Sequence, residues 1–377
     1  MRPLIQETNT SHSPESLVEQ LQGQAGIVLL RSRLFDSTQA RYSFVAVRPF
    51  LSFRSFGSRC ELLSMDKHSV QYGNPWHVLD GLMARYELLD EVDLPFPLGG
   101  CFGFWGYDLK NFVEPQLTRR AMDDLELPDC QVGFYDSLIV FDHRLQKTWI
   151  VSTGLQVDGS RSESQAHQQL GFWQQLLVNP LPDDPLNRNL EPVPRNFSRC
   201  VTSNLSRGEF MALVNRAQDY IRAGDIYQVN LAQRLAVASN LSGWDTFQRL
   251  AAVSPAPFSG FLDCGEFQIA SSSPELFLRL SGGHILTRPI KGTRPRAADP
   301  TRDAQLSYEL QTSAKEMAEL VMITDLLRND LGRVCAYGSV QVPELIRLER
   351  YPQVQHLVST VDGQLRDDVT HFAALAT

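Results

Sequence analysis

The chain has 377 residues, of which 43% are hydrophobic, and a formal net charge of −8. This length supports one or two hydrophobic cores, and the negative charge argues against binding to nucleic acid or to anionic membranes. Six cysteines without a C-x-x-C pair argue against a disulfide framework or a zinc site. The N-terminus lacks an apolar leader and no run approaches a membrane span, so we expect a cytoplasmic protein.

Strands dominate the first half of the predicted structure. Short β-branched and aromatic runs bounded by turn residues predict strands at 27–30, 42–47 and 137–142, whereas 75–89 has apolar residues at helical spacing. The glycine-rich segment 99–108 lacks the G-x-x-x-x-G-K-[ST] pattern of a phosphate loop. Its interleaved aromatic residues predict a tightly packed strand and turn instead.

A change in composition divides the chain. Segment 179–199 contains five prolines and no helical or strand period, so we expect an exposed linker between an N-terminal lobe, 15–178, and a second lobe, 200–377. After it, Ser206 and Glu209 form a capping box that opens a helix, and Gly224 ends that helix.

Further strands are expected at 258–262, 268–270 and 284–287. Strand runs with separate helices predict an α+β fold with antiparallel sheets.

The stretch 286–296 holds one lysine, Lys291, among three arginines, Arg288, Arg294 and Arg296. Neighbouring cations destabilise an ammonium group and make the neutral, nucleophilic amine easier to reach. Arginine forks bind carboxylates bidentately, so this stretch favours a site for a small polyanion. The alternative is a solvated basic turn.

Three acidic positions and one histidine are further candidates. Glu316 and Glu319 are three apart on a predicted helix, so both carboxylates face the same side and can bind Mg²⁺. Glu316 has a second explanation, because Ser313 lies three residues earlier and the two form a capping box. The sequence alone is consistent with Glu275 as a surface residue at the start of a strand. It is equally consistent with His356 as a hydrogen-bonded histidine of the core.

Several long motifs occur in one order along the second half. They are Ser-Ser-Ser-Pro-Glu at 271–275, Pro-Ile-Lys-Gly-Thr-Arg at 289–294, and the segments 313–319 and 325–333. In these motifs the chain resembles the chorismate-utilising enzymes, and within them the aminodeoxychorismate synthase component I branch. The resemblance is weak from Ile27 and dense from Ser206 onward. It implies a large antiparallel β-sandwich flanked by helices, like that of anthranilate synthase component I.

The resemblance also implies a reaction, the amination of chorismate at C4 to 4-amino-4-deoxychorismate in 4-aminobenzoate and folate synthesis. Lys291 would attack C2 of the ring while Glu275 protonates the departing 4-hydroxyl, and ammonia would then add at C4 and expel the lysine. The implied substrate contacts are Gly292, Thr293, Arg294 and His356. Mg²⁺ would bind Glu319 first and Glu316 second.

Two positions distinguish the branches of the family. Anthranilate synthases carry alanine where this chain has Lys291, and isochorismate and salicylate synthases use a lysine base where it has Gln228. Lys291 therefore favours the aminating branch over the main alternative, anthranilate synthase component I, which releases pyruvate. No glutaminase motif with a nucleophilic cysteine is visible, so we expect a separate glutamine amidotransferase subunit to supply ammonia.

The resemblance implies a second ligand, because some family members bind tryptophan at matching positions. These positions are Ser32, Arg41, Tyr42, Pro257, Phe258 and Ser259. The chain lacks the glutamate of the L-x-E-S pattern at residues 30–32, and ordinary strand packing explains the same residues.

The family continues beyond the match to residues 371–377 into a glycine-rich segment with further chorismate and magnesium ligands. We therefore expect a truncated catalytic lobe. A third hypothesis follows from it, an inactive fragment that keeps tryptophan or partner binding.

Overall fold

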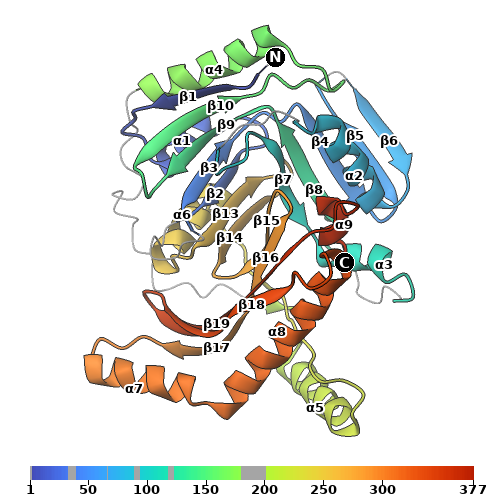
Figure 1. Ribbon diagram of the computed structural model, residues 1–377, viewed down its shortest axis with the longest axis vertical. Helices are drawn as coiled ribbons and strands as arrows, with labels where there is room; N and C mark the ends of the chain where they lie inside the picture. Colours follow the sequence, from blue (N-terminus) through green and yellow to red (C-terminus); the bar gives the residue numbers. More distant parts are fainter. Residues whose placement is uncertain (1, 33–39, 66, 89–93, 118–122, 180–200) are drawn as a thin grey trace.

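The computed structural model describes residues 2–32, 40–65, 67–88, 94–117, 123–179 and 201–377. Antiparallel sheets form its body and helices lie on their outer faces (Figure 1). This arrangement confirms the predicted α+β class. The expected linker falls outside the described residues apart from Asn179. Within the described ranges, no helix combines the length and apolar character needed to cross a membrane.

A seven-stranded sheet joins both halves of the sequence, since its last two strands come after the expected linker. Its order is β1 (Leu4–Thr8), β10 (Lys147–Ser152), β9 (Ser137–Asp142), β3 (Tyr42–Ala46), β2 (Val28–Arg31), β13 (Phe258–Asp263) and β14 (Gln268–Ser273). Three helices pack on one face: α1 (Pro14–Leu21), α4 (Glu163–Val178) and α6 (Gly243–Val253). Trp173 of α4, Phe247 of α6 and Phe261 of β13 are fully buried between the helices and the sheet.

The second sheet has five strands and packs against the seven-stranded sheet. Its order is β6 (His68–Tyr72), β5 (Arg59–Leu63), β4 (Leu51–Phe56), β8 (Cys130–Tyr135) and β7 (Gly100–Trp105). Its companion helices are α2 (Pro75–Tyr86), η1 (Tyr107–Leu109), α3 (Lys110–Val113) and α9 (His371–Leu375). A Cβ on Gly103 would lie 2.1 Å from the Gln131 carbonyl oxygen, so β7 passes β8 too closely for a side chain there. This contact confirms the tightly packed strand predicted for the glycine-rich segment.

The two sheets face each other across one apolar layer. Val140 and Leu262 of the seven-stranded sheet share a buried cluster with Tyr135 of the five-stranded sheet. Phe102 and Phe104 of β7 pack against the same cluster. Face-to-face packing of this kind defines a β-sandwich, as expected.

A third sheet carries the candidate active site. Its strands are β15 (Leu276–Ser281), β16 (His284–Arg288), β17 (Ile290–Pro295), β18 (Gln341–Arg350) and β19 (Val354–Gln364). Both β16 and β17 pair with β19, on either side of Pro289, and β18 pairs with β19 as well. Helices α7 (Pro300–Gln311) and α8 (Ala314–Val334) pack against β17 and β19. Leu310, Leu320 and Leu357 form the small core between these layers.

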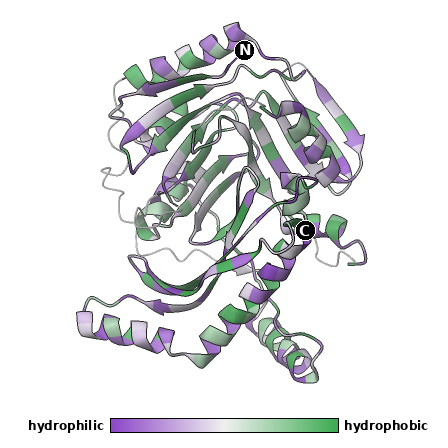
Figure 2. Cartoon of the chain, in the orientation of Figure 1, coloured by the Kyte–Doolittle hydropathy of each residue, from purple (hydrophilic) through white to green (hydrophobic). Residues whose placement is uncertain are grey.

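Helix α5 (Arg207–Ala223) projects from the rest of the molecule (Figure 1). In the sequence it lies between the short strands β11 (Thr202–Ser203) and β12 (Leu235–Ala236), which pair with each other. It begins at the predicted capping box of Ser206 and Glu209 and ends at Gly224, whose φ of +81° is left-handed. The helix buries none of its residues, although hydrophobic residues occur along it (Figure 2). The sequence thus predicted its start and its end, but its apolar face lies at the surface.

Candidate active site

Lys291 lies in β17 next to a β-bulge. It pairs with Leu357 and Thr293 pairs with His356, so Gly292 is the extra residue between them. Gly292 has φ +72°, a conformation that favours glycine. A Cβ there would lie 2.9 Å from Leu310 Cδ1 and 3.1 Å from Glu316 Cβ. The glycine after Lys291 therefore allows β17 to bulge against the start of α8.

His356 lies on the other side of this bulge and is only 7% exposed. Its Nδ1 is 3.0 Å from Thr293 Oγ1 and 3.4 Å from the Gly292 carbonyl oxygen. Burial lowers the pKa of His356, while the Gly292 carbonyl and the Glu275 carboxylate partly oppose this effect. His356 is hydrogen-bonded and buried, and it adjoins the residues that follow Lys291.

Glu275 approaches β17 from the turn between β14 and β15. Its carboxylate is exposed, and Oε1 accepts a hydrogen bond of 2.9 Å from the backbone amide of Ile290, the residue before Lys291. The same carboxylate contributes to the electrostatics of His356. Glu275 and His356 thus come from separate segments and contact β17 on either side of Lys291, at Ile290 and at Gly292–Thr293.

The three arginines of the basic stretch do not surround Lys291 as free cations. Arg288 pairs with Glu349, Arg294 with Glu316 and Arg296 with Asp303. Each guanidinium of the basic stretch therefore has a carboxylate partner within the protein. The alternative of a solvated basic turn is wrong, since these residues form β16 and β17 and Arg288 is buried. The Lys291 ammonium has no hydrogen-bond or ion-pair partner in the described ranges.

The two acidic residues of α8 have partners from different elements. Ser313 caps the helix through the Glu316 amide, at 3.4 Å, while the Glu316 carboxylate accepts from Arg294 Nη1, also at 3.4 Å. Glu319 Oε1 accepts a hydrogen bond of 2.7 Å from Gln228 Nε2. Gln228 therefore contacts directly the carboxylate that the sequence predicts as the first Mg²⁺ ligand.

A polar group behind His356 was not anticipated from the sequence. Tyr351 donates a hydrogen bond of 2.8 Å to Glu349 Oε2, and its ring centre lies 5.6 Å from that of His356. Glu349 also binds Arg288, which donates in turn to Thr360 Oγ1 at 3.2 Å. No local motif indicates this group, because it depends on the pairing of β18 with β19.

Comparisons with known proteins agree with this arrangement. The family model described as chorismate binding enzyme matches residues 31–377. The chain belongs to this family. It is 35% identical over 366 residues to anthranilate synthase component 1 of Acetivibrio thermocellus, covering 96% of this chain and 74% of that protein. It is also 35% identical over 344 residues to aminodeoxychorismate synthase component 1 of Escherichia coli (strain K12), covering 91% and 71%.

Solved structures agree with the fold. The crystal structure of anthranilate synthase component I from Streptococcus pneumoniae TIGR4 matches with a TM-score of 0.75 and 26% identity, over 98% of this chain and 79% of that one. MenF, the menaquinone-specific isochorismate synthase of Escherichia coli, matches with a TM-score of 0.62 and 14% identity, over 100% and 73%. The second match shows the fold alone.

For this chorismate-binding chain, the donor set expected for Mg²⁺ consists of Glu316 and Glu319. In the described ranges, no group of three or more His, Cys, Asp or Glu side chains converges as a metal site. Mg²⁺ commonly uses one or two carboxylates and keeps its other positions for water and substrate oxygens. Two carboxylates near the start of α8 therefore fit a magnesium ion shared with a substrate, rather than a cage made by the protein alone.

Part of the expected tryptophan site lies between β2 and β13. Ser32 Oγ donates a hydrogen bond of 3.2 Å to the Pro257 carbonyl oxygen. Ser259 pairs with Arg31, and its hydroxyl donates to the Ala256 carbonyl oxygen at 3.1 Å. The structure therefore brings these residues together from distant parts of the sequence, and their hydroxyls are occupied within the protein.

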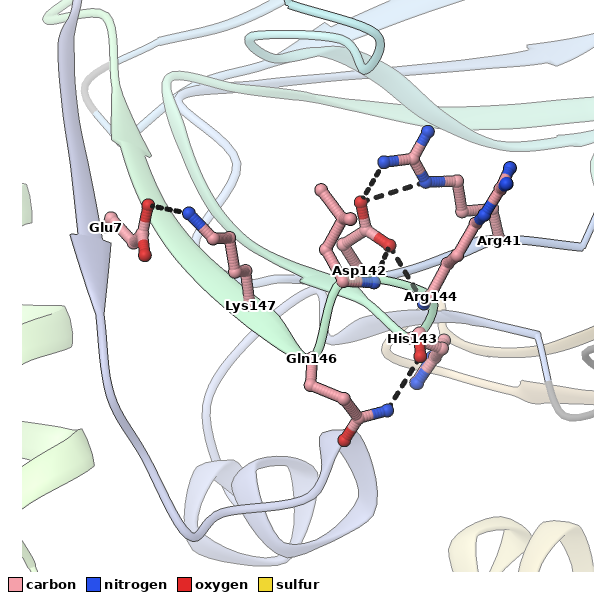
Figure 3. Close-up of polar contacts among 8 residues, drawn as sticks. Glu7, Arg41, Asp142, His143, Arg144, Gln146 and Lys147 are labelled. Atoms are coloured by element: carbon pink, nitrogen blue, oxygen red, sulfur yellow. Dashed lines mark hydrogen bonds and ion pairs between the residues drawn. The ribbon is translucent and has the colours of Figure 1, made fainter.

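Arg41 and Tyr42 complete the expected tryptophan set. Arg41 Nε donates to Asp142 Oδ2 at 2.9 Å, and Asp142 also accepts from the Arg144 amide (Figure 3). The Tyr42 ring packs edge-on against Phe96, and burial raises the pKa of its hydroxyl. That hydroxyl is buried without a hydrogen-bond partner in the described part of the chain, whereas Arg41 is held in place by Asp142.

A cavity of about 330 Å³ lies elsewhere, between α2, α3 and α9. Trp76, Phe112 and Phe372 are among its lining residues, and none of the predicted site residues is. The Lys291 region is instead an open face of the third sheet, in which Glu275 is exposed and Lys291 half-buried.

Proposed function

We propose that this chain aminates chorismate at C4, as an enzyme of the aminodeoxychorismate synthase component I type, and so acts in 4-aminobenzoate and folate synthesis. The observation that carries the proposal is the position of Lys291, whose amine has no partner in the described residues. It lies in β17 between Ile290, whose amide binds Glu275, and the bulge that pairs with His356. Relatives of both names match equally well, so the names alone do not choose the reaction. Lys291 is the residue that favours amination.

The first step of the proposed reaction is a covalent substitution. The neutral Lys291 amine forms a bond to C2, the two ring double bonds each shift by one position, and the C4–O bond breaks. Glu275 gives the departing hydroxyl its proton, so the oxygen leaves as water. Because Glu275 Oε1 accepts the Ile290 amide, Oε2 is the oxygen that carries this proton.

The second step reverses the shift. Ammonia forms a bond to C4, the double bonds return, and the C2–N bond to Lys291 breaks. Glu275, now a carboxylate, accepts the proton that the new C4 nitrogen releases, which restores the acid for the next cycle. Splitting one substitution into two in this way gives each step a better nucleophile or leaving group.

Other residues would bind and orient the substrate. The residues expected to contact the substrate lie at the β-bulge. Gly292, Thr293 and Arg294 follow Lys291 in β17, and His356 of β19 pairs with Thr293. Glu319 and Glu316 would hold Mg²⁺, which when bound neutralises a substrate carboxylate and fixes the ring. Together these residues would position C2 of the substrate against Lys291 and C4 against Glu275.

The proposal includes two further ligands. A glutamine amidotransferase subunit would supply ammonia, and the component 1 names of the relatives support a second subunit. L-Tryptophan would bind at the Ser32 and Tyr42 positions, and the buried Tyr42 hydroxyl, which has no partner among the described residues, supports a ligand there. A rise in melting temperature with tryptophan tests this binding independently of turnover.

Anthranilate synthase component I is the second candidate function. The Acetivibrio relative and the Streptococcus structure carry that name and match this chain over nearly its whole length. Lys291 is the observation against it. The two functions give different products, because anthranilate formation releases pyruvate and amination at C4 retains the enolpyruvyl group.

Product analysis by mass spectrometry tests the proposal. The purified chain is incubated with chorismate, Mg²⁺ and ammonium, beside Lys291→Ala and a control, Lys315→Ala, which removes an exposed lysine of α8. We expect aminodeoxychorismate from the wild type and the control, and none from Lys291→Ala. Anthranilate would instead support the second candidate, and no product from a folded sample would support the inactive-fragment hypothesis.

A further inference from the structure

Both candidate metal carboxylates already have partners within the protein. Arg294 Nη1 lies 3.4 Å from Glu316 Oε1, and it also donates to the Thr293 carbonyl oxygen at 2.8 Å. Gln228 Nε2 donates to Glu319 Oε1 at 2.7 Å. A divalent cation that binds these oxygens must therefore compete with the Arg294 guanidinium at Glu316 and with the Gln228 amide at Glu319. It either displaces these groups or shares the oxygens with them.

The contact between Arg294 and Glu316 is suited to exchange. Their side chains are 29% and 18% exposed, so water screens the pair, and such pairs contribute little to stability. Two additional positive charges at Glu316 would also repel the guanidinium. Occupation of the carboxylate by a cation therefore favours release of Arg294.

The released side chain lies close to the reacting residue. Arg294 follows Lys291 by three positions in β17, which corresponds to about 10 Å along a strand. A guanidinium binds a carboxylate through two parallel hydrogen bonds, and a lysine lacks this geometry. The substrate class proposed for the site carries two carboxylates.

We propose that Arg294 is an internal counterion of Glu316 which a divalent cation displaces, and that the freed guanidinium then binds a carboxylate of the substrate. This inference rests on the proposed function for the substrate. Cation binding and substrate binding then favour each other. The cation releases the Arg294 guanidinium that binds the substrate, and the substrate keeps that guanidinium away from Glu316. The cation-free chain consequently binds the substrate weakly.

Binding of Mn²⁺ to the cation-free chain, followed by electron paramagnetic resonance, tests the first half of the inference without turnover. Removing the competing charge in Arg294→Gln should tighten Mn²⁺ binding roughly two- to fivefold. Arg296→Gln is the matched control, since Arg296 is also in a strand-end ion pair, 2.9 Å from Asp303, and its loss should leave Mn²⁺ affinity unchanged. Unchanged or weaker Mn²⁺ binding by Arg294→Gln overturns the inference, as does an absence of Mn²⁺ binding by the wild type.

A second variant distinguishes the effect of the positive charge of Arg294 from that of the bidentate hydrogen-bonding geometry of its guanidinium. Arg294→Lys keeps the competing charge, so its Mn²⁺ affinity should stay near that of the wild type, while its affinity for chorismate with Mg²⁺ present should fall. Equal chorismate affinity in the wild type and both Arg294 variants overturns the second half. These binding results are independent of the Lys291→Ala product assay, so the inference can fail while amination stands.

Discussion

The β-sandwich and the third sheet with its helices differ in how they use apolar and charged side chains. In the sandwich, large residues such as Phe53, Phe134 and Trp173 are almost completely buried. In the third sheet Phe277 is 66% exposed, Leu326 of α8 is 55% exposed, and α5 buries no residue. The sandwich therefore provides most of the stability, whereas the candidate chemistry lies on a thinner and more open layer.

One ion pair from each region illustrates this difference, although the Arg288–Glu349 pair of the third sheet is also mostly buried. In the sandwich the Arg31 and Glu15 side chains form an ion pair that is almost fully buried, and Asp136 is buried beside α4. Near Lys291 the Arg294 and Glu316 side chains are partly exposed, and the distance from Arg294 Nη1 to Glu316 Oε1 is 3.4 Å. Buried pairs resist change, while exposed pairs exchange partners at low cost. Substitutions in the sandwich should thus alter stability, and those near Lys291 should alter binding or catalysis.

The largest expected effect on stability is that of Trp173→Ala. Trp173 is fully buried and its Nε1 donates to Ser137 Oγ at 3.0 Å, so the variant leaves a cavity and an unpaired hydroxyl. We expect a loss of about 3–5 kcal/mol in the free energy of unfolding, measured by urea titration. Lys291→Ala should stay within about 0.5 kcal/mol of the wild type in the same titration. Equal losses in the two variants would contradict the proposed division.

Asp136 should give a smaller effect that depends on pH. Burial raises the pKa of this carboxyl to about 6 from the usual 3.8, partly opposed by the hydrogen bond from Gln165. The folded state thus keeps a proton that the unfolded state has lost, and stability falls as the pH rises from about 4 to about 6. This difference in pKa corresponds to about 3 kcal/mol. Asp136→Asn should remove that part of the slope in urea titrations between pH 4 and pH 7, and an unchanged slope would refute the assignment.

Two helix caps provide the finest comparison. Ser13 caps α1 and Ser206 caps α5, each through a capping box, but α1 buries Leu17, Val18 and Leu21 whereas α5 buries nothing. Ser13→Ala should lower the free energy of global unfolding by about 1 kcal/mol. Ser206→Ala should leave it nearly unchanged and speed amide hydrogen exchange within α5 alone. A global loss of similar size in both variants would show that α5 unfolds with the core.

Local signals in the sequence predicted many elements of the fold. The strand at 137–142 has the predicted bounds, and the helix expected at 75–89 ends early, at Tyr86. The capping box and Gly224 located both ends of α5 because caps are local interactions. Periodicity did not indicate that the apolar face of α5 is exposed, because exposure depends on the elements around it.

The candidate site was less predictable, for the same reason. The motifs identified Lys291 and Glu275 as candidates, but the contact between Glu275 and the Ile290 amide joins two segments that only the fold brings together. The sequence shows three arginines near Lys291, but their carboxylate partners come from α7, α8 and β18. A linear sequence shows the charges of a segment and not the partners that neutralise them.

The most direct test of the account is peptide mapping by mass spectrometry after incubation with chorismate and Mg²⁺ in the absence of ammonia. The account predicts an adduct on Lys291 with the mass of chorismate less one water, which disappears when ammonium is added and aminodeoxychorismate forms. Lys315→Ala should give the same adduct, and Lys291→Ala should give none. Formation of aminodeoxychorismate by Lys291→Ala at the wild-type rate would contradict the central role assigned to Lys291.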